Sequence, residues 1–189
     1  LMQNMYVGML KTSADNLGET IVNLNQVLDI NLGKNVTWSF HDLHHVAQTA
    51  MSSISTLAET KGVHLINDIP ENYTMFVIPA YLDSIVLNLL TNGIKFRGPN
   101  RDAYVRLSAQ RDGKATVITV EDNGLGIDLA MHGDKVFGLY KTFHQNTDSK
   151  GLGLFITKNQ VEAMGGTITV ESQVDAGTTF MITLPNQKP

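Results

Sequence analysis

The sequence predicts an α+β fold, in which helices cover one face of a mixed β-sheet as a two-layer sandwich, after one separate N-terminal helix. Two observations predict it. Residues 1–33 carry a heptad pattern of apolar residues, and the segments from residue 36 onward follow the order β-α-β-β-α-β-β-α-β-β. With 189 residues, 42% apolar and 17% charged, the chain is able to bury a core under those helices.

The composition excludes several kinds of function. A net charge of -4 leaves no basic excess for binding nucleic acid or an anionic membrane. The absence of cysteine excludes disulfides, thiolate metal sites and cysteine nucleophiles. No apolar run reaches the roughly 18–20 residues that span a bilayer, and the N-terminus lacks a signal-peptide pattern. We therefore expect a soluble, cytoplasmic fragment cut from a longer protein, and a membrane-anchored parent would fit as well as a soluble one.

The first expected element is a helix in residues 1–33 that pairs with another helix. Its apolar residues recur at alternating steps of three and four and form one seam: Val7, Leu10, Ala14, Leu17, Ile21, Leu24 and Leu28. A lone helix cannot bury such a seam, so we expect it to pack against a second helix or a second copy of the chain, as in a homodimer. Packing against its own domain is the alternative. Residues 31–35, which include Gly33, are the expected linker.

A second domain is expected over residues 36–185. Its first half should contain, in order, a strand at 36–40, a helix at 43–62, strands at 63–69 and 74–78, and a helix at 79–96 that begins with Pro79. Its second half should contain a hairpin of 104–109 and 115–120 around Asp112 and Gly113, and an irregular segment 128–150 with a helical piece at 136–140. A helix at 152–164 and strands at 167–171 and 178–184 complete it.

Three short motifs carry the chemistry, and the first lies on the expected helix 79–96. Asn88, Asn92 and Lys95 fall at i, i+4 and i+7, and therefore on one face. An asparagine carbonyl is a hard oxygen ligand suited to Mg²⁺, which leaves most of its coordination positions to phosphate and water. A lysine contacts phosphate as a point charge. Taken alone, this face would also fit a solvated polar stripe.

The second motif is a glycine-rich turn directly after an apolar strand. Asp122 stands at the strand end, where a carboxylate can accept a hydrogen bond from the exocyclic amine of adenine. Gly124 and Gly126 allow the chain to turn tightly beneath the base. Taken alone, the segment is also an ordinary turn rich in Asp, Asn and Gly.

The third motif opens the expected helix 152–164. Lys150, Gly151 and Gly153 precede or begin it, and the free N–H groups of a helix N-terminus can bind phosphate oxygens that glycines let approach closely. In this order, the three motifs predict a site for a metal-bound nucleoside triphosphate.

Together the motifs resemble the ATP-binding catalytic domain of sensor histidine kinases, whose Bergerat fold is shared with gyrase B, MutL and the Hsp-type chaperone ATPases. The resemblance covers 36–184. It rests on 88–96 as the N box, 122–126 and 149–154 as the two glycine boxes, 135–140 as the F box and 177–180 as the terminal strand signature. The preceding helix resembles the second helix of the dimerisation and phosphotransfer hairpin, and 137–144 with its short lid is similar to PAS-linked kinases.

The resemblance implies a role for each motif residue. Asn92 would coordinate Mg²⁺ and Lys95 would contact phosphate, which makes these two the expected catalytic residues, with Asn88 supporting the metal and phosphate side. Asp122 would bind the adenine amine. The other ATP-binding positions are expected at Gly124, Gly126, Phe137, Lys150, Gly151 and Gly153, and at Thr178 or Thr179 beside the adenine.

By the same resemblance, the domain transfers the γ-phosphoryl group of Mg-ATP to a histidine, for onward signalling to the receiver domain of a response regulator. No histidine here has the context of the family's acceptor, so we expect ATP binding without autophosphorylation. His44 and His45 are expected at the surface, and their spacing from His41 is compatible with a metal site. Ser149 stands where the family usually has glycine, which would stiffen the expected lid 128–150 or alter its hinge.

Two other functions fit part of the sequence. A nucleotide-insensitive signalling scaffold would keep the fold without needing Asn92, Asp122 and Gly126, whose presence argues against it. An ATP-hydrolysing machine of the gyrase B or MutL kind needs a general base, typically a glutamate four residues before the metal-binding asparagine. That position is Asn88 here, which argues against activation of water.

Overall fold

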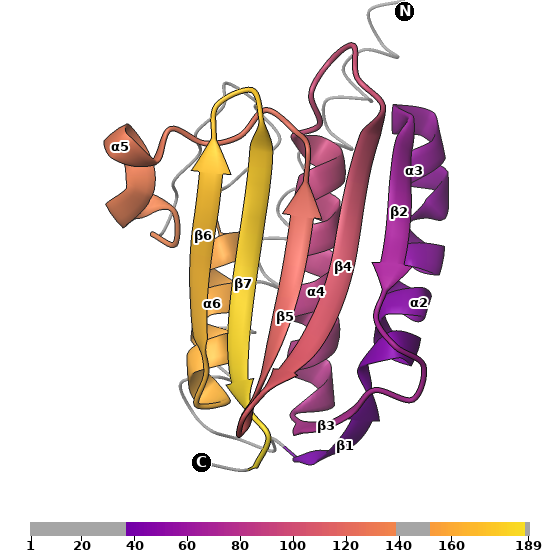
Figure 1. The fold of residues 1–189 in the computed structure, drawn as a ribbon, viewed down its shortest axis with the longest axis vertical. Helices are drawn as coiled ribbons and strands as arrows, with labels where there is room; N and C mark the ends of the chain where they lie inside the picture. The colour runs from indigo at the N-terminus through magenta and orange to yellow at the C-terminus, as the bar shows by residue number, and fades with distance from the viewer. Residues whose placement is uncertain (1–36, 139–151, 188–189) are drawn as a thin grey trace, which may run out of the picture. The chain divides into compact units, whose positions relative to one another are not determined.

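The structure, a computed structural model, describes residues 37–138 and 152–187. Within them the largest sheet is a five-stranded mixed β-sheet (Figure 1). Its strands stand in the order β2 (Val63–Asp68), β4 (Ala103–Asp112), β5 (Ala115–Asp122), β7 (Gly177–Pro185) and β6 (Thr167–Gln173). β2 pairs with β4 in parallel, and the other three pairs are antiparallel. A separate two-stranded sheet joins β1 (Ser39–Asp42) to β3 (Thr74–Val77).

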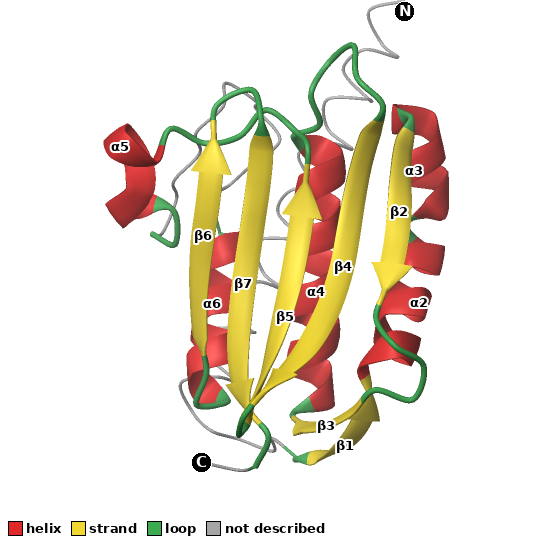
Figure 2. Ribbon diagram, viewed as in Figure 1, coloured by secondary structure: helices red, strands yellow, loops and turns green. Residues whose placement is uncertain are grey.

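Four helices lie together on one face of the five-stranded sheet, as Figure 2 shows: α2 (Leu43–Ser53), α3 (Ser55–Lys61), α4 (Pro79–Lys95) and α6 (Gly153–Ala163). The short helix α5 (Leu129–His132) and the 3-10 turn η1 (Gly133–Lys135) lie beside β6, at the edge of the sheet.

The core lies between the helices and the sheet. Alternate residues of the three central strands are buried there: Ala103, Val105, Leu107, Thr116, Ile118, Val120, Thr178, Phe180, Ile182 and Leu184. α4 contributes Leu82, Ile85, Leu89, Leu90 and Ile94, each at most 1% exposed. The intervening strand positions, such as Arg106, Thr119 and Met181, remain half-exposed on the other face. The predicted two-layer α+β sandwich is therefore confirmed.

The helix expected at 43–62 is broken at Ile54 into α2 and α3. Around the break, the Ser53 hydroxyl donates to the Ala50 carbonyl at 2.7 Å and the Ser55 hydroxyl donates to the Ser52 carbonyl at 3.0 Å. Such side-chain bonds to nearby carbonyls compete with the regular helical pattern, which explains why this serine-rich stretch interrupts it. Gly62 ends α3 in the left-handed conformation, at the predicted position.

The helical piece expected at 136–140 is wrong in its described part, because residues 136–138 form a turn. Val136 is buried, so its apolar character reflects packing and not helix formation. The helical turn comes earlier, at α5, where the Asp128 carboxylate accepts a hydrogen bond from the Met131 N–H at 3.1 Å and caps the helix. The helix expected at 1–33 and its linker lie outside the described residues. Among the described residues, every helix is too short or too polar to cross a bilayer.

Candidate functional site

The turn 122–126 continues from β5 at one end of the sheet. In the strand register Asp122 lies between Val105 of β4 and Thr178 of β7, which places these three residues on the helix-covered face. The Asp122 carboxylate accepts hydrogen bonds from the backbone N–H groups of Gly124, at 2.8 Å, and of Thr178. The strand register and these two bonds fix its position.

The environment of Asp122 shifts its acidity. Burial raises the pKa of this carboxyl from 3.8 to about 6, the two backbone N–H groups act in the opposite direction, and the neighbouring Glu121 charge raises it further. Because the shift stops below 7, the group is mostly ionised at neutral pH. It is a partly desolvated hydrogen-bond acceptor.

Two glycines let this turn pack closely against its neighbours. A Cβ at Gly126, whose φ is 68°, would lie 1.9 Å from the carbonyl oxygen of Gln173 in β6. A Cβ at Gly124 would lie 2.4 Å from the carbonyl oxygen of Phe96, just after α4. Any side chain at either position would push the turn away from backbone on both sides.

The three residues predicted on the α4 face are Asn88, Asn92 and Lys95, and Asn88 is bonded to the neighbouring helix α6. The Asn88 amide donates to the Thr157 hydroxyl of α6 at 2.7 Å, so it joins the two helices. Gly153 approaches the same amide so closely that a Cβ there would lie 2.4 Å from Asn88 Oδ1. Asn92 and Lys95 follow one and two turns later, and both are half-buried. α4 therefore brings the first motif next to the start of α6.

The third motif is described from residue 152 onward. α6 begins at Gly153, and its N-terminal end is the end that contacts Asn88. Lys150 and Gly151 lie outside the described residues, as do His144 and Ser149. The F-box residue Phe137 meets Phe180 of β7 edge to face, with ring centroids 6.4 Å apart and planes at 66°. Phe180 is buried on the helix-covered face, so Phe137 contacts the same layer as Asp122.

The structure separates the two threonines that the sequence left equivalent. Thr178 is 7% exposed, lies on the helix-covered face beside Asp122, and has its hydroxyl 3.0 Å from that of Ser172. Thr179 is paired in register with Glu121 and Glu171, and therefore lies on the open face of the sheet. A shallow depression at the strand ends is lined by residues of both faces, with Glu121 and Thr179 as well as Asp122 and Thr178.

Two residues that hold the site together were not singled out from the sequence. The Ser172 hydroxyl accepts from the Ile127 N–H at 2.8 Å and donates to the Gly177 carbonyl at 2.7 Å, tying the turn to β7. The Asn123 side chain accepts from the Tyr104 N–H at 2.9 Å and donates to the Asp102 carbonyl at 2.8 Å. Asn123 lies inside the second motif, where an asparagine side chain commonly bonds to backbone; Ser172 had no comparable signal.

Among the described residues, no three His, Asp or Glu side chains gather as a metal site would require. His44 has another role, because its Nδ1 lies 2.7 Å from the Ile69 carbonyl oxygen and joins α2 to the end of β2. An Mg²⁺ ion at the site would therefore rely on amide oxygens, water and the ligand's own phosphates, a donor set that this ion accepts. The half-buried amide of Asn92 fits that description.

Comparison with known families agrees with this geometry. Residues 78–188 match the family described as "Histidine kinase-, DNA gyrase B-, and HSP90-like ATPase", which is more than half of the 189 residues. The chain belongs to this family.

Two relatives that align along almost the whole chain are named as sensor or histidine kinases. The circadian input-output histidine kinase CikA of Synechococcus elongatus is 29% identical over 192 residues, which cover 98% of this chain and 25% of that protein. The autoinducer 2 sensor kinase/phosphatase LuxQ of Vibrio parahaemolyticus is 30% identical over 202 residues, which cover 97% of this chain and 22% of that protein. The chain thus spans about a quarter of the length of these curated relatives.

Solved structures show the same fold. The histidine kinase AdeS of Acinetobacter baumannii superposes with a TM-score of 0.77 at 16% identity, covering 92% of this chain and 80% of that one. Full-length ShkA in complex with AMPPNP gives a TM-score of 0.75 at 26% identity, covering 100% of this chain and 40% of that one. The chain therefore contains the ATPase domain of this family, and the relatives that align along almost its whole length are named as a histidine kinase and a sensor kinase/phosphatase.

Proposed function

We propose that this chain binds Mg-ATP between the α4 face, the turn 122–126 and the start of α6, and passes the γ-phosphoryl group to a histidine outside the chain. The observation that carries the proposal is Asp122, a desolvated carboxylate held by two backbone N–H groups on the helix-covered face. With a pKa of about 6 it is mostly ionised at pH 7 and can accept a hydrogen bond from the adenine amine. Guanine presents a carbonyl oxygen at that position, which a carboxylate repels.

The α4 face supplies the groups for the phosphates. A bound Mg²⁺ would bridge phosphate oxygens and offset their negative charge. Asn92 would give this ion one amide oxygen, and the Lys95 ammonium would contact a phosphate oxygen directly. The first N–H groups of α6 lie next to this face through the contact of Gly153 with Asn88, and they favour negative charge there. Of the other expected positions, we propose Thr178, rather than Thr179, beside the adenine, and keep Lys150 and Gly151 on the phosphate side.

Charge neutralisation and positioning, without a general base that activates water, suit transfer of a phosphoryl group from ATP to a histidine. Asn88 stands where an ATP-hydrolysing relative would need a glutamate. Its amide donates to Thr157 and offers no basic group to activate water. This contact favours kinase chemistry over ATP hydrolysis.

The remaining parts of the reaction are proposed from the relatives. CikA and LuxQ are named as a histidine kinase and as a sensor kinase/phosphatase. We propose that the acceptor histidine lies on a helix outside this chain, that residues 1–33 help to form a homodimer, and that a receiver domain takes the phosphoryl group onward. The domain would work in the cytoplasm, where ATP is supplied.

Calorimetric titration of ATP into the chain, with and without Mg²⁺, tests the nucleotide site. We expect metal-dependent binding that Asp122→Asn weakens about a hundredfold, since a hydrogen bond to a charged group is lost, and that Asn92→Ala weakens in the presence of Mg²⁺. Asp112→Asn, at the exposed last residue of β4 opposite the start of β5, is the matched control and should bind normally. Binding that survives both site variants would overturn the proposal. Acid-labile phosphate on the isolated chain would overturn the proposal that the acceptor histidine lies outside the chain.

A further inference from the structure

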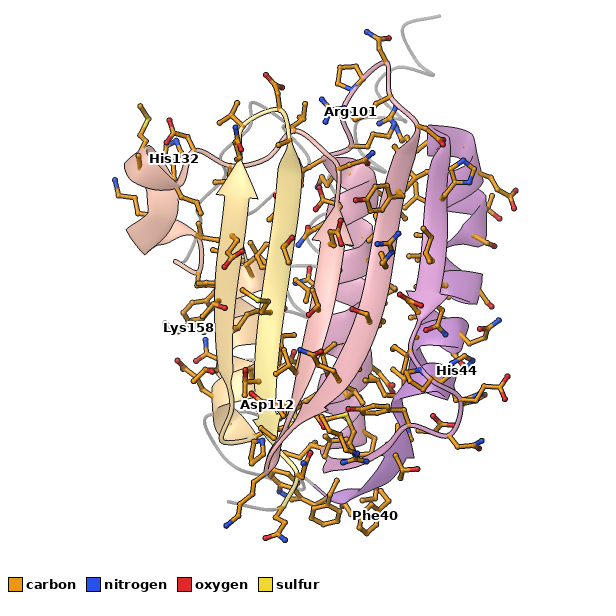
Figure 3. The ribbon with its side chains drawn as sticks, viewed as in Figure 1. Phe40, His44, Arg101, Asp112, His132 and Lys158 are labelled. Carbon is orange, nitrogen blue, oxygen red and sulfur yellow. The ribbon has the colours of Figure 1, made fainter. Side chains whose placement is uncertain are left out.

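Arg101 joins two segments that carry the nucleotide site. It lies in the loop between α4 and β4, at the end of the sheet opposite Asp112, as Figure 3 shows. Its Nη1 donates to the carbonyl oxygen of Asn123 at 2.8 Å and to that of Asp175 at 3.0 Å, and lies 3.4 Å from that of Gly124. One nitrogen with two hydrogens thus serves the turn 122–126 and the β6–β7 turn at once.

The guanidinium is held in place by its surroundings. Gly98 lies against it so closely that a Cβ there would stand 2.5 Å from Nε and 2.8 Å from Cζ. The two turns that it joins also bond to each other, because the Asp175 N–H donates to the Leu125 carbonyl at 2.7 Å. A planar, permanently charged group that presents several donors in fixed directions suits such a junction better than a flexible ammonium.

The two segments that Arg101 joins lead directly to the two N–H donors that hold the Asp122 carboxylate. One donor is the Gly124 N–H, in the turn 122–126, and the other is the Thr178 N–H, which follows the β6–β7 turn. Arg101 bonds to one carbonyl within the turn 122–126 and to another, that of Asp175, three residues before Thr178. Fixing the distance between the segments also fixes the distance between the two N–H groups, and therefore the position of the carboxylate between them.

We propose that Arg101 is a positioning residue for base selectivity: by joining the two turns, it holds the Asp122 carboxylate where it accepts the hydrogen bond from the adenine amine. This inference rests on the proposed nucleotide site and adds a residue that contacts no nucleotide itself. A residue that only supported the fold would affect all nucleotides alike. A residue that positions Asp122 affects the part of the affinity that depends on the amine.

The test compares ATP with purine riboside triphosphate, which lacks the 6-amino group, by calorimetry in Mg²⁺ on the full chain. In the wild type, the ratio of the two dissociation constants reports the bond between the amine and Asp122. We expect Arg101→Met to weaken ATP about tenfold, to leave the analogue within about twofold, and so to reduce the ratio about tenfold. Arg101→Lys, which keeps the charge and reaches one carbonyl, should show an intermediate ratio.

Arg111→Met is the matched control. Arg111 also donates to a backbone carbonyl, that of Thr74 at 2.8 Å, but it lies near the opposite end of β4. We expect this variant to keep the wild-type ratio. Equal weakening of ATP and the analogue in Arg101→Met would overturn the inference and leave the nucleotide site intact. If that variant does not fold, a wild-type ratio in Arg101→Lys overturns it instead. Failure of the wild type to bind ATP would overturn the proposed function itself.

Discussion

The two ends of strand β5 use glycine for different purposes. At one end Gly113, in the β4–β5 turn, has a φ of 57° and no atom within 4 Å of the place where a Cβ would stand. At the other end Gly126 has a φ of 68°, and a Cβ would lie 1.9 Å from the Gln173 carbonyl oxygen. Both positions need the backbone freedom of glycine, but Gly126 also needs its small size. Close backbone packing distinguishes the end of the sheet that carries Asp122.

Alanine substitutions separate the two requirements and give the largest expected effect. Gly113→Ala should lower the free energy of unfolding by about 1–2 kcal/mol, because it penalises only the left-handed backbone conformation. Gly126→Ala should lower it by at least about 3 kcal/mol, because the methyl group also displaces the turn from β6. Urea unfolding at pH 7 measures both values. Equal losses would show that the two ends are packed alike.

Features that depend on a local sequence pattern could be predicted from the sequence, whereas features that depend on contacts between distant parts of the chain could not. The motifs located Asp122 and the glycines because a strand followed by a glycine-rich turn is a local pattern. The choice between Thr178 and Thr179 depended on the register of β7 against β5, where a slip of one residue moves every side chain to the other face. The contact of Asn88 with Thr157 joins residues 69 positions apart, and no local sequence pattern predicts it. The roles of individual nucleotide-binding residues remain predictions.

A second comparison sets Asp122, the last residue of β5, against Asp112, the last residue of β4 at the opposite end of the sheet. Because burial raises the pKa of Asp122 from 3.8 to about 6, its ionised form costs the folded domain about 3 kcal/mol at pH 7. Asparagine removes this charge but gives up one of two N–H bonds, worth about 1 kcal/mol. We therefore expect Asp122→Asn to raise the free energy of unfolding by about 1–2 kcal/mol while weakening ATP binding. Asp112→Asn should change neither quantity appreciably.

The sign of this effect follows from the direction of the shift. A carboxyl whose pKa is raised on folding stabilises the folded state most below pH 3.8 and loses that contribution as the pH rises through 6. The advantage of Asp122→Asn should therefore shrink between pH 7 and pH 5. Urea unfolding of both proteins at the two pH values measures it. An advantage that grows toward pH 5 would mean that the pKa is lowered and not raised.

The same titration should appear in nucleotide binding. The adenine amine needs an ionised acceptor, so ATP affinity should fall about tenfold between pH 7 and pH 5 as Asp122 takes up a proton. Purine riboside triphosphate carries the same phosphates without the amine, and its own pH dependence serves as the control for phosphate titration. The difference between the pH dependence of ATP affinity and that of the analogue's affinity reports the titration of Asp122. Identical slopes would remove this carboxylate from base recognition.

The smallest expected effect compares two buried threonines, each at 0% exposure and each bonded at 2.7 Å to an asparagine. Thr157 accepts from Asn88 on the α4 face, whereas Thr116 donates to Asn186 at the far end of β5. Valine at either position should lower the free energy of unfolding by about 1–2 kcal/mol, because a half-buried asparagine side chain loses its hydrogen-bond partner. Only Thr157→Val should also weaken ATP binding, by about threefold, since the Asn88 amide is then no longer held in the position from which it would support the metal and phosphate side. Unfolding and calorimetry on both variants test this, and equal ATP affinity would assign Asn88 to the fold alone.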